Sequence, residues 1–535
     1  MRLQFNPRGK VVLVSKRGVI LLGIILVCIA ASGFRTELSA QAESGHLVYA
    51  TKDTPDTLDV TKSSLPIVHA MAWNYLDPLV RRKKGETGYY PGLAQRWTVS
   101  PDLKTYTFQL RRDVRFHDGT PLTADAVKAG IERLLDTPAA PLPGRSEART
   151  FRWPLLRCET ADEHTVRVLF AEPCGSFLRA ASTVSVPILS PHAKGGLEAV
   201  GTGPFILEEY VEGDHATFVR NDAYTWGPGW THGGPAYIER LTYRFIPEEI
   251  VRIAMLRGNE ADLIDGVSAN QIYRVLRDKR LGVGISEFRG APWTLFFNCG
   301  RFPTNDRVVR QAVSYAIDRE SMVERLFKGT TGPAFSPLER GTSGYDRDVE
   351  SLSTHDPGRA AAILDRAGWV KGPDGVREKK GRRLVVVALV PESQREAAQA
   401  VASQIEKIGV ELRVNIARRE APHPAEGEQN LLLTCRYGTD PLFLHEWVSS
   451  CRNGKEYPPY YVNPRLSDLL VEAEAAVDPS GRAATYRTVQ EVLLIEAACV
   501  PLYEKSMVLG FREEVGGITY SPAGYPLFYE VSFME

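Results

Sequence analysis

The sequence predicts a mixed α/β protein built as two lobes. Strand-like and helix-like segments alternate along the chain after residue 42, and the roughly 490 residues there suffice for two to four domains or lobes. The clearest unit is a strand at Arg383–Val390, a helix over Glu392–Ile408 that stops at Gly409, and a strand at Val410–Ala417. A strand, helix and strand of these lengths predict a parallel crossover, which is almost always right-handed.

The first lobe is predicted to begin with a buried strand at His46–Thr51 and to contain a small strand, turn and helix unit. Apolar residues alternate along TYTFQL through Tyr106, Phe108 and Leu110, as in a half-buried strand. Thr123 is a suitable N-cap for the helix that follows. We expect two apolar helix faces here: Val127, Ile131, Leu134 and Leu135 on this helix, and Ile250, Ile253, Ala254 and Leu256 on a helix at 248–258.

The second lobe is predicted to begin near Trp293 with the strand TLFFN. Asp356 followed by Pro357 indicates an N-cap and a favoured first-turn proline, and Gly368 indicates the end of that helix. The strand-like segment VPLYEKSMVLGF follows the last two clear helices, so we expect it to return the chain to the first lobe.

Residues 1–42 have the order of a secretory signal peptide. A basic segment precedes an apolar core at Gly18–Phe34, and small residues up to Ala42 suit cleavage after that position. An uncleaved anchor is the alternative, whereas lipidation at Cys28 is disfavoured because Val27 stands where a small residue is expected. The leader holds six Lys or Arg against one Glu. The rest of the chain therefore has 59 Lys or Arg against 64 Asp or Glu, a net charge of −5. This mildly acidic body argues against a nucleic-acid-binding protein.

Export would place the six cysteines after the leader in an oxidising compartment. Two disulfides are candidates, each closing a loop or hairpin: Cys158–Cys174 and Cys435–Cys451. Cys299 and Cys499 have the character of small buried hydrophobic residues. No CxxC is present, which argues against a zinc knot.

Enzyme signatures are absent from the sequence, and the partial matches have structural interpretations. GTGPF at Gly201–Phe205 lacks the third glycine and the lysine of a phosphate loop, and we interpret it as a tight turn that needs positive φ. Asp262 and Asp265 are interpreted as exposed loop charges rather than as a glycosidase pair. We therefore expect no catalytic residue, no metal site and no cofactor.

One stretch near the C-terminus combines aromatic and polar residues. Its members are Tyr437, Asp440, Phe443, His445, Trp447, Tyr457, Tyr460 and Tyr461. Such a mixture suits a wet ligand pocket in which Asp440 faces a cationic group, and a surface loop with aromatic packing is the alternative. Within it, Asp440, His445 and Glu446 are a weak candidate for a metal or hydrolase site.

Several motifs occur in a fixed order along the chain. The longest, from Pro91, is PGLAQRWTVSPDLKTYTFQLRRDVRFHDGTPLTADAV. It is followed by GTGPFILEEYVEGDHATFVRND, RGNEADL and FNCGRFPTNDRVVRQAVSYAIDRESM. Together they resemble the family 5 solute-binding proteins of ABC transporters, the peptide, dipeptide and nickel-binding group. The resemblance extends from about residue 46 to residue 530.

The resemblance implies a two-lobed periplasmic binding protein fold of type II, class C, with an extra subdomain on the first lobe. The expected boundaries are 1–42 for the signal peptide, 43–292 for the first lobe with its subdomain at about 83–182, 293–504 for the second lobe, and 505–535 for the return. Two hinge crossings are expected near Trp293–Asn298 and Leu502–Glu504. The ligand would be enclosed by hinge motion and handed to a membrane permease.

The resemblance is weaker where it concerns the ligand. Peptide binders of this family have a segment Trp-x-x-Asp-Tyr-x-x-Pro, whose Asp pairs with the ligand's amino group. Aligned on Pro441, the segment CRYGTDPLF places Tyr437 at that Asp, so Asp440 would have to replace it after a loop shift. The ligand contacts that we expect, including the loop Asp53–Thr57, are Asp53, Thr54, Thr57, Trp293, Asn298, Tyr437, Gly438, Asp440 and Trp447.

The sequence therefore predicts an exported, periplasmic solute-binding protein, not an enzyme. It would capture short peptides by lobe closure and deliver them to an ABC permease with its ATPase subunits, with no nucleic-acid partner. Nickel complexes, opines, oligosaccharides and haem are the alternative solutes. Two alternatives change the role: a sensor anchored by an uncleaved N-terminal helix, and an enzyme that uses Asp440, His445 and Glu446.

Overall fold

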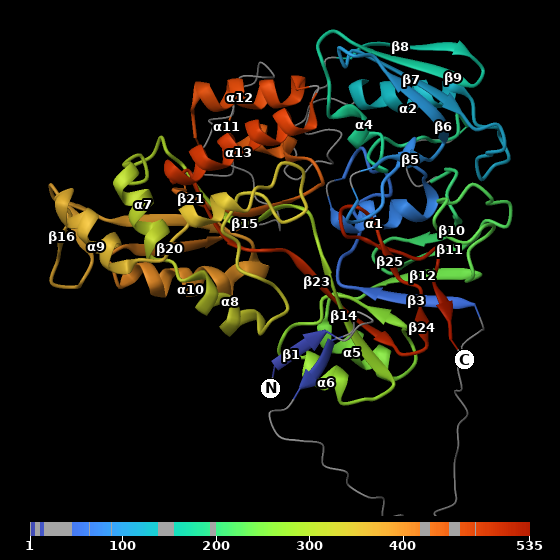
Figure 1. The fold of residues 1–535 in the computed structure, drawn as a ribbon. Coiled ribbons are helices and arrows are strands. Elements are labelled where there is room, and N and C mark those ends of the chain that lie inside the picture. The colour runs from blue at the N-terminus through green and yellow to red at the C-terminus, as the bar shows by residue number, and fades with distance from the viewer. Residues whose placement is uncertain are drawn as a thin grey trace, which may run out of the picture.

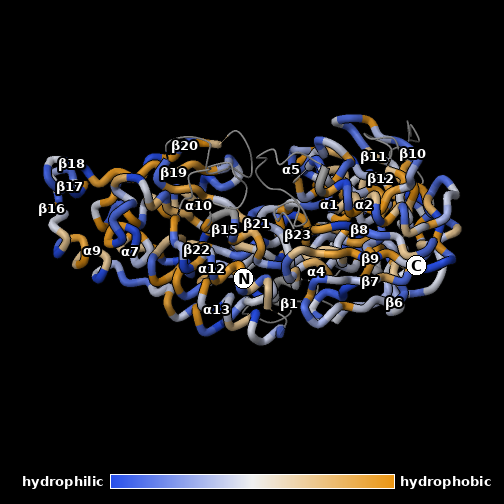
Figure 2. The backbone as a smooth tube through the Cα atoms, turned by 90° about the horizontal axis from the view of Figure 1, so that it is seen from above, coloured by the Kyte–Doolittle hydropathy of each residue, from blue (hydrophilic) through white to orange (hydrophobic). Residues whose placement is uncertain are grey.

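The computed structural model contains two bodies that lie side by side, each built around its own β-sheet (Figure 1). Seen from above, the two bodies lie to the left and right and meet in the middle, and apolar segments run through both (Figure 2). The structure describes residues 2–5, 11–14, 45–63, 65–86, 88–136, 155–192, 199–417, 429–448, 461–476 and 478–534.

The first lobe, mostly blue and green in Figure 1, is centred on a seven-stranded sheet in the order β10, β11, β12, β3, β13, β23, β14. The strands are β3 (His46–Thr51), β10 (Phe205–Val211), β11 (His215–Arg220), β12 (Arg240–Phe245), β13 (Leu263–Ile264), β14 (Leu281–Glu287) and β23 (Ser506–Arg512). β3 pairs in parallel with β12 and β13, whereas β23 is antiparallel to β13 and β14. The helices of this lobe are α1 (Pro66–Tyr75), α5 (Glu249–Arg257) and α6 (Ile272–Leu276).

A four-stranded antiparallel sheet forms a subdomain on the first lobe. Its order is β6 (Ala94–Val99), β7 (Thr105–Leu110), β9 (Thr165–Phe170) and β8 (Leu155–Asp162). Helix α2 (Ala124–Asp136) packs against β8 and β9, and the short helix α4 (Phe177–Ala180) follows the sheet. Tyr106 and Phe108 are buried, as their alternation predicted. The hydroxyl of Thr123 accepts the N–H of Ala126 at 3.3 Å, which confirms the predicted N-cap.

The second lobe is built on a five-stranded sheet in the order β20, β19, β21, β15, β22. The strands are β15 (Gly290–Phe297), β19 (Val385–Val390), β20 (Glu411–Ile416), β21 (Leu431–Tyr437) and β22 (Cys499–Tyr503). The helices are α7 (Arg307–Ala316), α8 (Arg319–Phe327), α9 (Pro357–Arg366), α10 (Arg395–Glu406), α11 (Leu444–Val448), α12 (Pro464–Ala475) and α13 (Pro479–Ile495). Strands β19 and β20 pair in parallel with α10 between them in sequence, so the predicted crossover is confirmed.

Shorter elements complete the described fold. The short strands are β1 (Arg2–Phe5), β2 (Val11–Val14), β4 (Val80–Arg81), β5 (Tyr90–Pro91), β16 (Val370–Lys371), β17 (Arg377–Lys379), β18 (Arg382–Arg383), β24 (Val515–Gly516), β25 (Thr519–Tyr520), β26 (Pro526–Leu527) and β27 (Ser532–Phe533). The 3-10 helices are η1 (Asp348–Leu352), η2 (Glu392–Gln394) and η3 (Pro441–Phe443). Among the described residues, no helix has the length and apolar character needed to cross a bilayer, and the leader's apolar core lies outside them.

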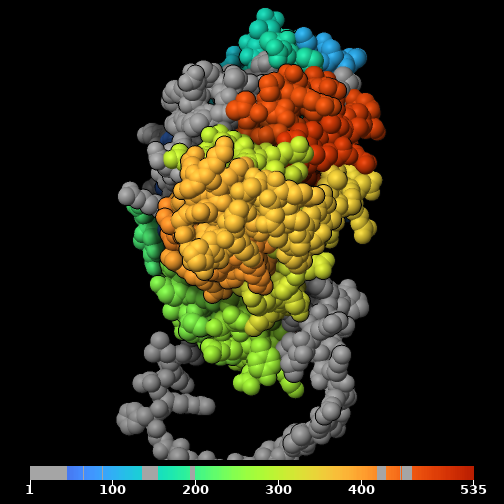
Figure 3. Space-filling model, turned by 90° about the vertical axis from the view of Figure 1, so that its left-hand side faces the viewer, coloured from blue at the N-terminus to red at the C-terminus, as the bar shows by residue number. Residues whose placement is uncertain are grey.

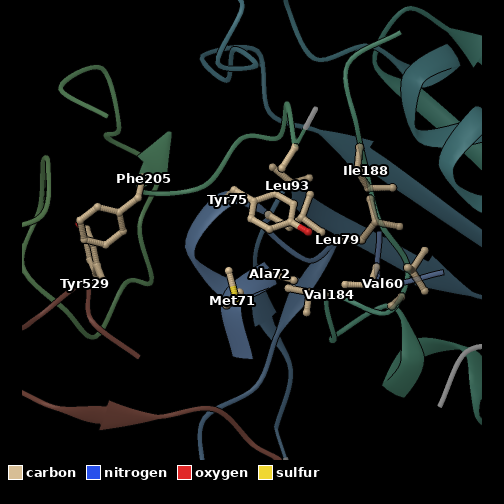
Figure 4. Close-up of a cluster of buried hydrophobic side chains, with 14 of the residues drawn as sticks. Val60, Met71, Ala72, Tyr75, Leu79, Leu93, Val184, Ile188, Phe205 and Tyr529 are labelled. Carbon is tan, nitrogen blue, oxygen red and sulfur yellow. The ribbon is translucent and has the colours of Figure 1, made fainter. Parts of the chain in front are cut away.

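The C-terminal segment completes the core of the first lobe. Figure 4 shows Tyr529 beside Phe205 of β10, next to side chains of α1 such as Met71 and Tyr75. Burying large apolar side chains is the dominant favourable term in folding, so this segment contributes to the stability of the first lobe. The chain therefore ends in the lobe in which it begins.

The predicted disulfide of the subdomain and the predicted apolar face of α5 are both wrong. Cys158 and Cys174 are separate buried thiols and form no disulfide, because each side chain packs into the apolar core of the subdomain. Ile250 is 56% exposed, because α5 turns Arg252, Met255 and Leu256 inward instead. The Cys435–Cys451 pairing stays a prediction, since Cys451 lies outside the described residues.

The glycines of GTGPF serve a purpose that differs from the predicted one. Neither Gly201 nor Gly203 has a positive φ. A Cβ on Gly201 would lie 1.8 Å from the carbonyl oxygen of Tyr75, and a Cβ on Gly203 would lie 2.6 Å from that of Asn74. These glycines are therefore required by the close approach of the C-terminal end of α1.

Candidate functional site

The chain passes twice between the two lobes. Strand β14 ends at Glu287 in the first lobe, and β15 begins at Gly290 in the second. Strand β22 ends at Tyr503 in the second lobe, and β23 begins at Ser506 in the first. The first crossing therefore precedes the range 293–298 given by the sequence, which falls in and just after β15.

A buried ion pair joins the two crossings. The ammonium of Lys505 lies 2.6 Å from a carboxylate oxygen of Glu339 and donates to the carbonyl of Ala291 at 2.6 Å. Both side chains of the pair are 2% exposed. The N–H of Phe288 donates to the carbonyl of Lys505 at 3.2 Å, so backbone and side chain both hold the crossings together.

Tyr437 stands beside these crossings, at the end of β21. Its ring centroid lies 4.9 Å from that of Phe288 and 6.4 Å from that of Tyr525, and the ammonium of Lys505 lies 5.0 Å from it. Burial raises the pKa of Tyr437 well above its usual value, and the charges around it, which include Asp53, act in the same direction. The phenol therefore stays neutral, and the charge of a carboxylate of the first lobe acts on a side chain of the second.

That carboxylate belongs to an acidic group at the end of β3. Asp265 accepts hydrogen bonds from the hydroxyls of Tyr49 at 3.0 Å and Thr51 at 2.7 Å, and from the N–H of Lys52 at 2.9 Å. Burial and the charge of Asp53 raise the pKa of Asp265. Asp53 itself is 40% exposed, so it is the member of the group that a solute can reach.

Asp262 and Asp265 are both buried, which corrects the interpretation of them as exposed loop charges. They flank the two-residue strand β13 in the middle of the seven-stranded sheet. Asp262 accepts the N–H of Val48 at 2.8 Å and lies 3.8 Å from Arg512. Burial raises its pKa to about 6. The two carboxyls thus fix β3 and the loop after it.

Asp440 lies between the lobes with two arginines of the protein beside it. The guanidinium of Arg482 donates to both of its carboxylate oxygens at 2.9 Å, and Arg179 of the first lobe lies 3.1 Å away. Burial raises the pKa of Asp440, but Arg482 and Arg179 outweigh this effect, so the pKa lies below its usual value. The cations that face Asp440 are therefore protein groups, which differs from the expected pairing with a ligand amine.

The structure brings some of the other expected ligand contacts to the crossings and leaves some elsewhere. Gly438 donates its N–H to the carbonyl of Arg289 at 2.9 Å, within the first crossing. Thr54 is exposed in the loop after β3, where Thr57 accepts the N–H of Asp59 at 3.1 Å.

The two expected contacts from β15 lie in different places. Trp293 is half-buried and pairs in register with Tyr503. Asn298 follows the far end of β15, about 25 Å along the strand from the crossing at Gly290. The N–H of Asn298 donates to the carbonyl of Asn430 at 2.8 Å within the second lobe. Helix α11 carries Trp447, whose side chain lies outside the described part of the structure.

The positions of three buried charged groups were missed in the sequence analysis: Lys505, Glu339 and Asp265. Lys505 and Glu339 are far apart in sequence, and each looks like an ordinary surface charge there. Asp265 was noticed but interpreted as exposed. Asp265 directly follows the apolar pair Leu263 and Ile264, and a charge at the end of such an apolar segment was the available signal.

Asp440 and His445, two residues of the alternative metal or hydrolase site, face other side chains of the protein. His445 lies 2.5 Å from Glu474, and both side chains are buried, so this pair connects α11 to α12. No cluster of three or more metal-ligating side chains occurs in the parts of the chain that the structure describes. The side chain of Glu446 lies outside them.

The comparisons with known proteins agree with this geometry. Residues 88–464 match the family described as "Bacterial extracellular solute-binding proteins, family 5 Middle". A probable D,D-dipeptide-binding periplasmic protein of Escherichia coli is 26% identical, with 95% of this chain and 97% of the relative aligned. Heme-binding protein A of Haemophilus influenzae is 27% identical, with 85% of this chain and 86% of the relative aligned.

A solved structure extends the agreement to the fold. NikA from Brucella suis, in complex with Fe(III)-EDTA, has a TM-score of 0.78 and 25% identity over 91% of this chain and 99% of that one. The predicted two-lobed α/β fold of type II is confirmed by this likeness. The chain belongs to the family 5 extracellular solute-binding proteins, which bind solutes and are not a family of enzymes.

Proposed function

We propose that this chain is the extracytoplasmic subunit of an ABC importer and that short peptides are its cargo. It would be exported by the leader at 1–42, close its lobes on a peptide, and deliver it to a permease with ATPase subunits. The relative from Escherichia coli, named as a D,D-dipeptide-binding protein, supports this ligand class. The two crossings supply the hinge that such capture requires.

The observation that carries the ligand assignment is the partly exposed carboxylate of Asp53, in the loop after β3. A peptide has a free ammonium, which must be paired with a carboxylate when it leaves water. Tyr437 stands where peptide binders have that carboxylate, and Asp440 already faces Arg482 and Arg179. Asp53 is partly exposed, and its ion pair with Lys52, at 3.5 Å, is exposed as well, so a ligand ammonium can compete for it. We therefore assign the ammonium to Asp53.

Calorimetry with Ala-Ala tests this assignment. We expect Asp53→Asn to weaken binding about 10- to 100-fold, because a charge-assisted hydrogen bond is lost. N-acetyl-Ala-Ala, which lacks the ammonium, should bind weakly to the wild type and be insensitive to the substitution. Asp56→Asn, an exposed carboxylate three residues further along the same loop, is the matched control and should bind as the wild type does.

Two results would contradict the proposal in different ways. Unchanged Ala-Ala affinity in Asp53→Asn would overturn the role of Asp53 alone. Native mass spectrometry of protein purified from its own periplasm tests the ligand class, since it identifies what the protein carries. A co-purified metal complex or sugar in place of di- to pentapeptides would overturn the peptide assignment and leave the family membership intact.

A non-peptide solute is the second candidate, and the residue at position 437 favours it. A neutral tyrosine replaces the acid of the peptide binders, and a phenol can stack on or donate to an uncharged ligand. Heme-binding protein A is named for a non-peptide solute, and NikA was solved in complex with Fe(III)-EDTA. This candidate predicts that Tyr437→Phe weakens binding while Asp53→Asn does not.

A further inference from the structure

One group of contacts joins the two lobes at a place apart from the crossings. Arg179, on α4 of the first lobe, lies 3.1 Å from the carboxylate of Asp440 in the second lobe. The guanidinium of Arg82, also in the first lobe, donates to the hydroxyl of Thr439 at 3.1 Å. In Figure 3 the orange-red residues of the second lobe and the blue and cyan subdomain lie at the same end of the molecule.

A backbone contact lies at the same junction. The N–H of Gly175 donates to the carbonyl of Glu474, at the end of α12 in the other lobe, at 3.0 Å. A Cβ on Gly175 would lie 3.1 Å from that oxygen and 3.3 Å from the carbonyl of Ala476. The two lobes therefore approach each other here to backbone distance, which requires that they are closed.

The carboxylate of Asp440 is held in position by its own lobe. Arg482 donates to both oxygens, and Arg482 is itself fixed by donation to the carbonyl of Ala473 at 3.0 Å. If the lobes separate, Asp440 keeps Arg482, and Arg179, which is already 17% exposed, can be hydrated. Opening thus breaks an ion pair without leaving a buried carboxylate unpaired, so the contact is reversible.

We propose that Arg179 and Asp440 form a latch that holds the lobes closed. Both are positioning residues and touch no solute. This inference rests on the proposed capture by lobe closure, but it concerns the protein's own contacts and not the ligand. Loss of the latch should raise the rate of opening, and hence of ligand dissociation, by the same factor for every ligand.

Hydrogen exchange at two adjacent amides tests the latch. The amide of Gly175 bonds across the lobes, whereas that of Cys174 bonds to the carbonyl of Leu103 within the first lobe. We expect Arg179→Gln to speed exchange at Gly175 about tenfold, as a loss of ~1.4 kcal/mol predicts, with Cys174 unchanged. Mass spectrometry with electron-transfer fragmentation separates the two sites. Arg111→Gln, which removes an arginine paired with Asp113 on the same subdomain, is the control and should change neither.

A second variant removes the other charge of the latch. Asp440→Asn keeps an acceptor for the N–H of Leu442, which Asp440 caps at 3.3 Å, and removes the charge that attracts both Arg179 and Arg482. It should reproduce the effect of Arg179→Gln, and the double variant should add little to either. Small-angle scattering of both variants should show a larger radius of gyration than that of the wild type.

Three results would overturn the latch. They are an unchanged Gly175 amide in Arg179→Gln, equal acceleration at Gly175 and Cys174, and a wild-type Gly175 amide that exchanges as fast as in an unfolded peptide. None of these measurements uses an added ligand, so failure of the peptide assignment leaves them intact. If Ala-Ala binds, its dissociation can be compared with that of N-acetyl-Ala-Ala in Asp440→Asn. Faster dissociation of Ala-Ala alone would assign Asp440 to the ligand amine and would overturn the latch.

Discussion

Glu504, at the second crossing, is a single carboxyl whose ionisation is disfavoured. Its side chain is 18% exposed and lies 3.6 Å from Arg340. Burial raises its pKa to about 7, which Arg340 opposes and the neighbouring Glu339, Glu287 and Glu350 reinforce. Because the folded pKa is above the unfolded value, the folded chain holds this proton more tightly, so stability falls as the pH rises from about 4.5 towards 7.

We therefore expect Glu504→Gln to stabilise the protein at pH 8 by about 1 to 3 kcal/mol and to have little effect at pH 5, where Glu504 is protonated in the folded state. Urea denaturation at the two pH values measures this difference. Glu320→Gln, at an exposed position on α8, is the control and should leave the unfolding free energy unchanged at both pH values. Equal effects of Glu504→Gln at both pH values would contradict the prediction.

Single residues also show where sequence reasoning stops. Tyr437 was chosen as a candidate ligand contact from its spacing to Pro441, and the structure has it beside the crossings, in contact with Phe288. The partners of Asp440 could not be found in the same way. Arg482 and Arg179 are 42 and 261 positions away, and only the packing of two lobes brings them together. Local spacing thus predicts which residues are candidates for the site, but it does not predict which side chains contact them.

Helix α1 and the GTGPF segment illustrate the same limit for elements. The glycines were noticed, yet their cause was assigned to φ, because a sequence displays turn chemistry and not the approach of a distant carbonyl. The helix capped by Asp356 and the crossover through α10 were predicted well, since capping and apolar periodicity are local signals. The order of the strands in the two sheets could not be derived from local signals.

The packing of GTGPF against α1 predicts a large effect of a small substitution. A Cβ at Gly201 would meet the carbonyl oxygen of Tyr75 and a methyl group of Leu76 at 2.9 Å, and the backbone of a buried helix cannot move aside easily. We expect Gly201→Ala to destabilise the protein by about 3 kcal/mol in chemical denaturation. Gly233→Ala is the control, because Gly233 is exposed with ordinary φ and open space, and should cost less than about 0.5 kcal/mol.

The whole molecule is two sheets joined by two short crossings, and its family motifs predicted this division better than its composition did. The second crossing was expected at 502–504 and lies between Tyr503 and Ser506. The first was expected a few residues too late, because Gly290 and Pro292 suggest a boundary just before Trp293, whereas β15 already begins at Gly290. What the sequence could not convey is that Lys505 and Glu339 meet between the crossings.

This pair leads to a prediction that separates the hinge from the latch. Lys505→Met leaves the carboxylate of Glu339 buried without its cation, and burial already raises the pKa of Glu339. We expect a loss of about 3 to 5 kcal/mol in unfolding free energy at pH 7. The double variant Lys505→Met with Glu339→Leu should recover most of this loss, because two apolar side chains need no partner.

The hinge pair and the latch should respond differently because they act on different equilibria. Lys505 and Glu339 stay together whether the lobes are open or closed, since both lie where the crossings meet, so their loss lowers global stability. Arg179 and Asp440 meet only across the closed lobes, so Arg179→Gln should lower the free energy of unfolding in urea by no more than about 1.4 kcal/mol while it opens the lobes. An Arg179→Gln variant as destabilised as Lys505→Met would mean that the lobes unfold as one unit and that the contact at Asp440 belongs to the fold, not to its motion.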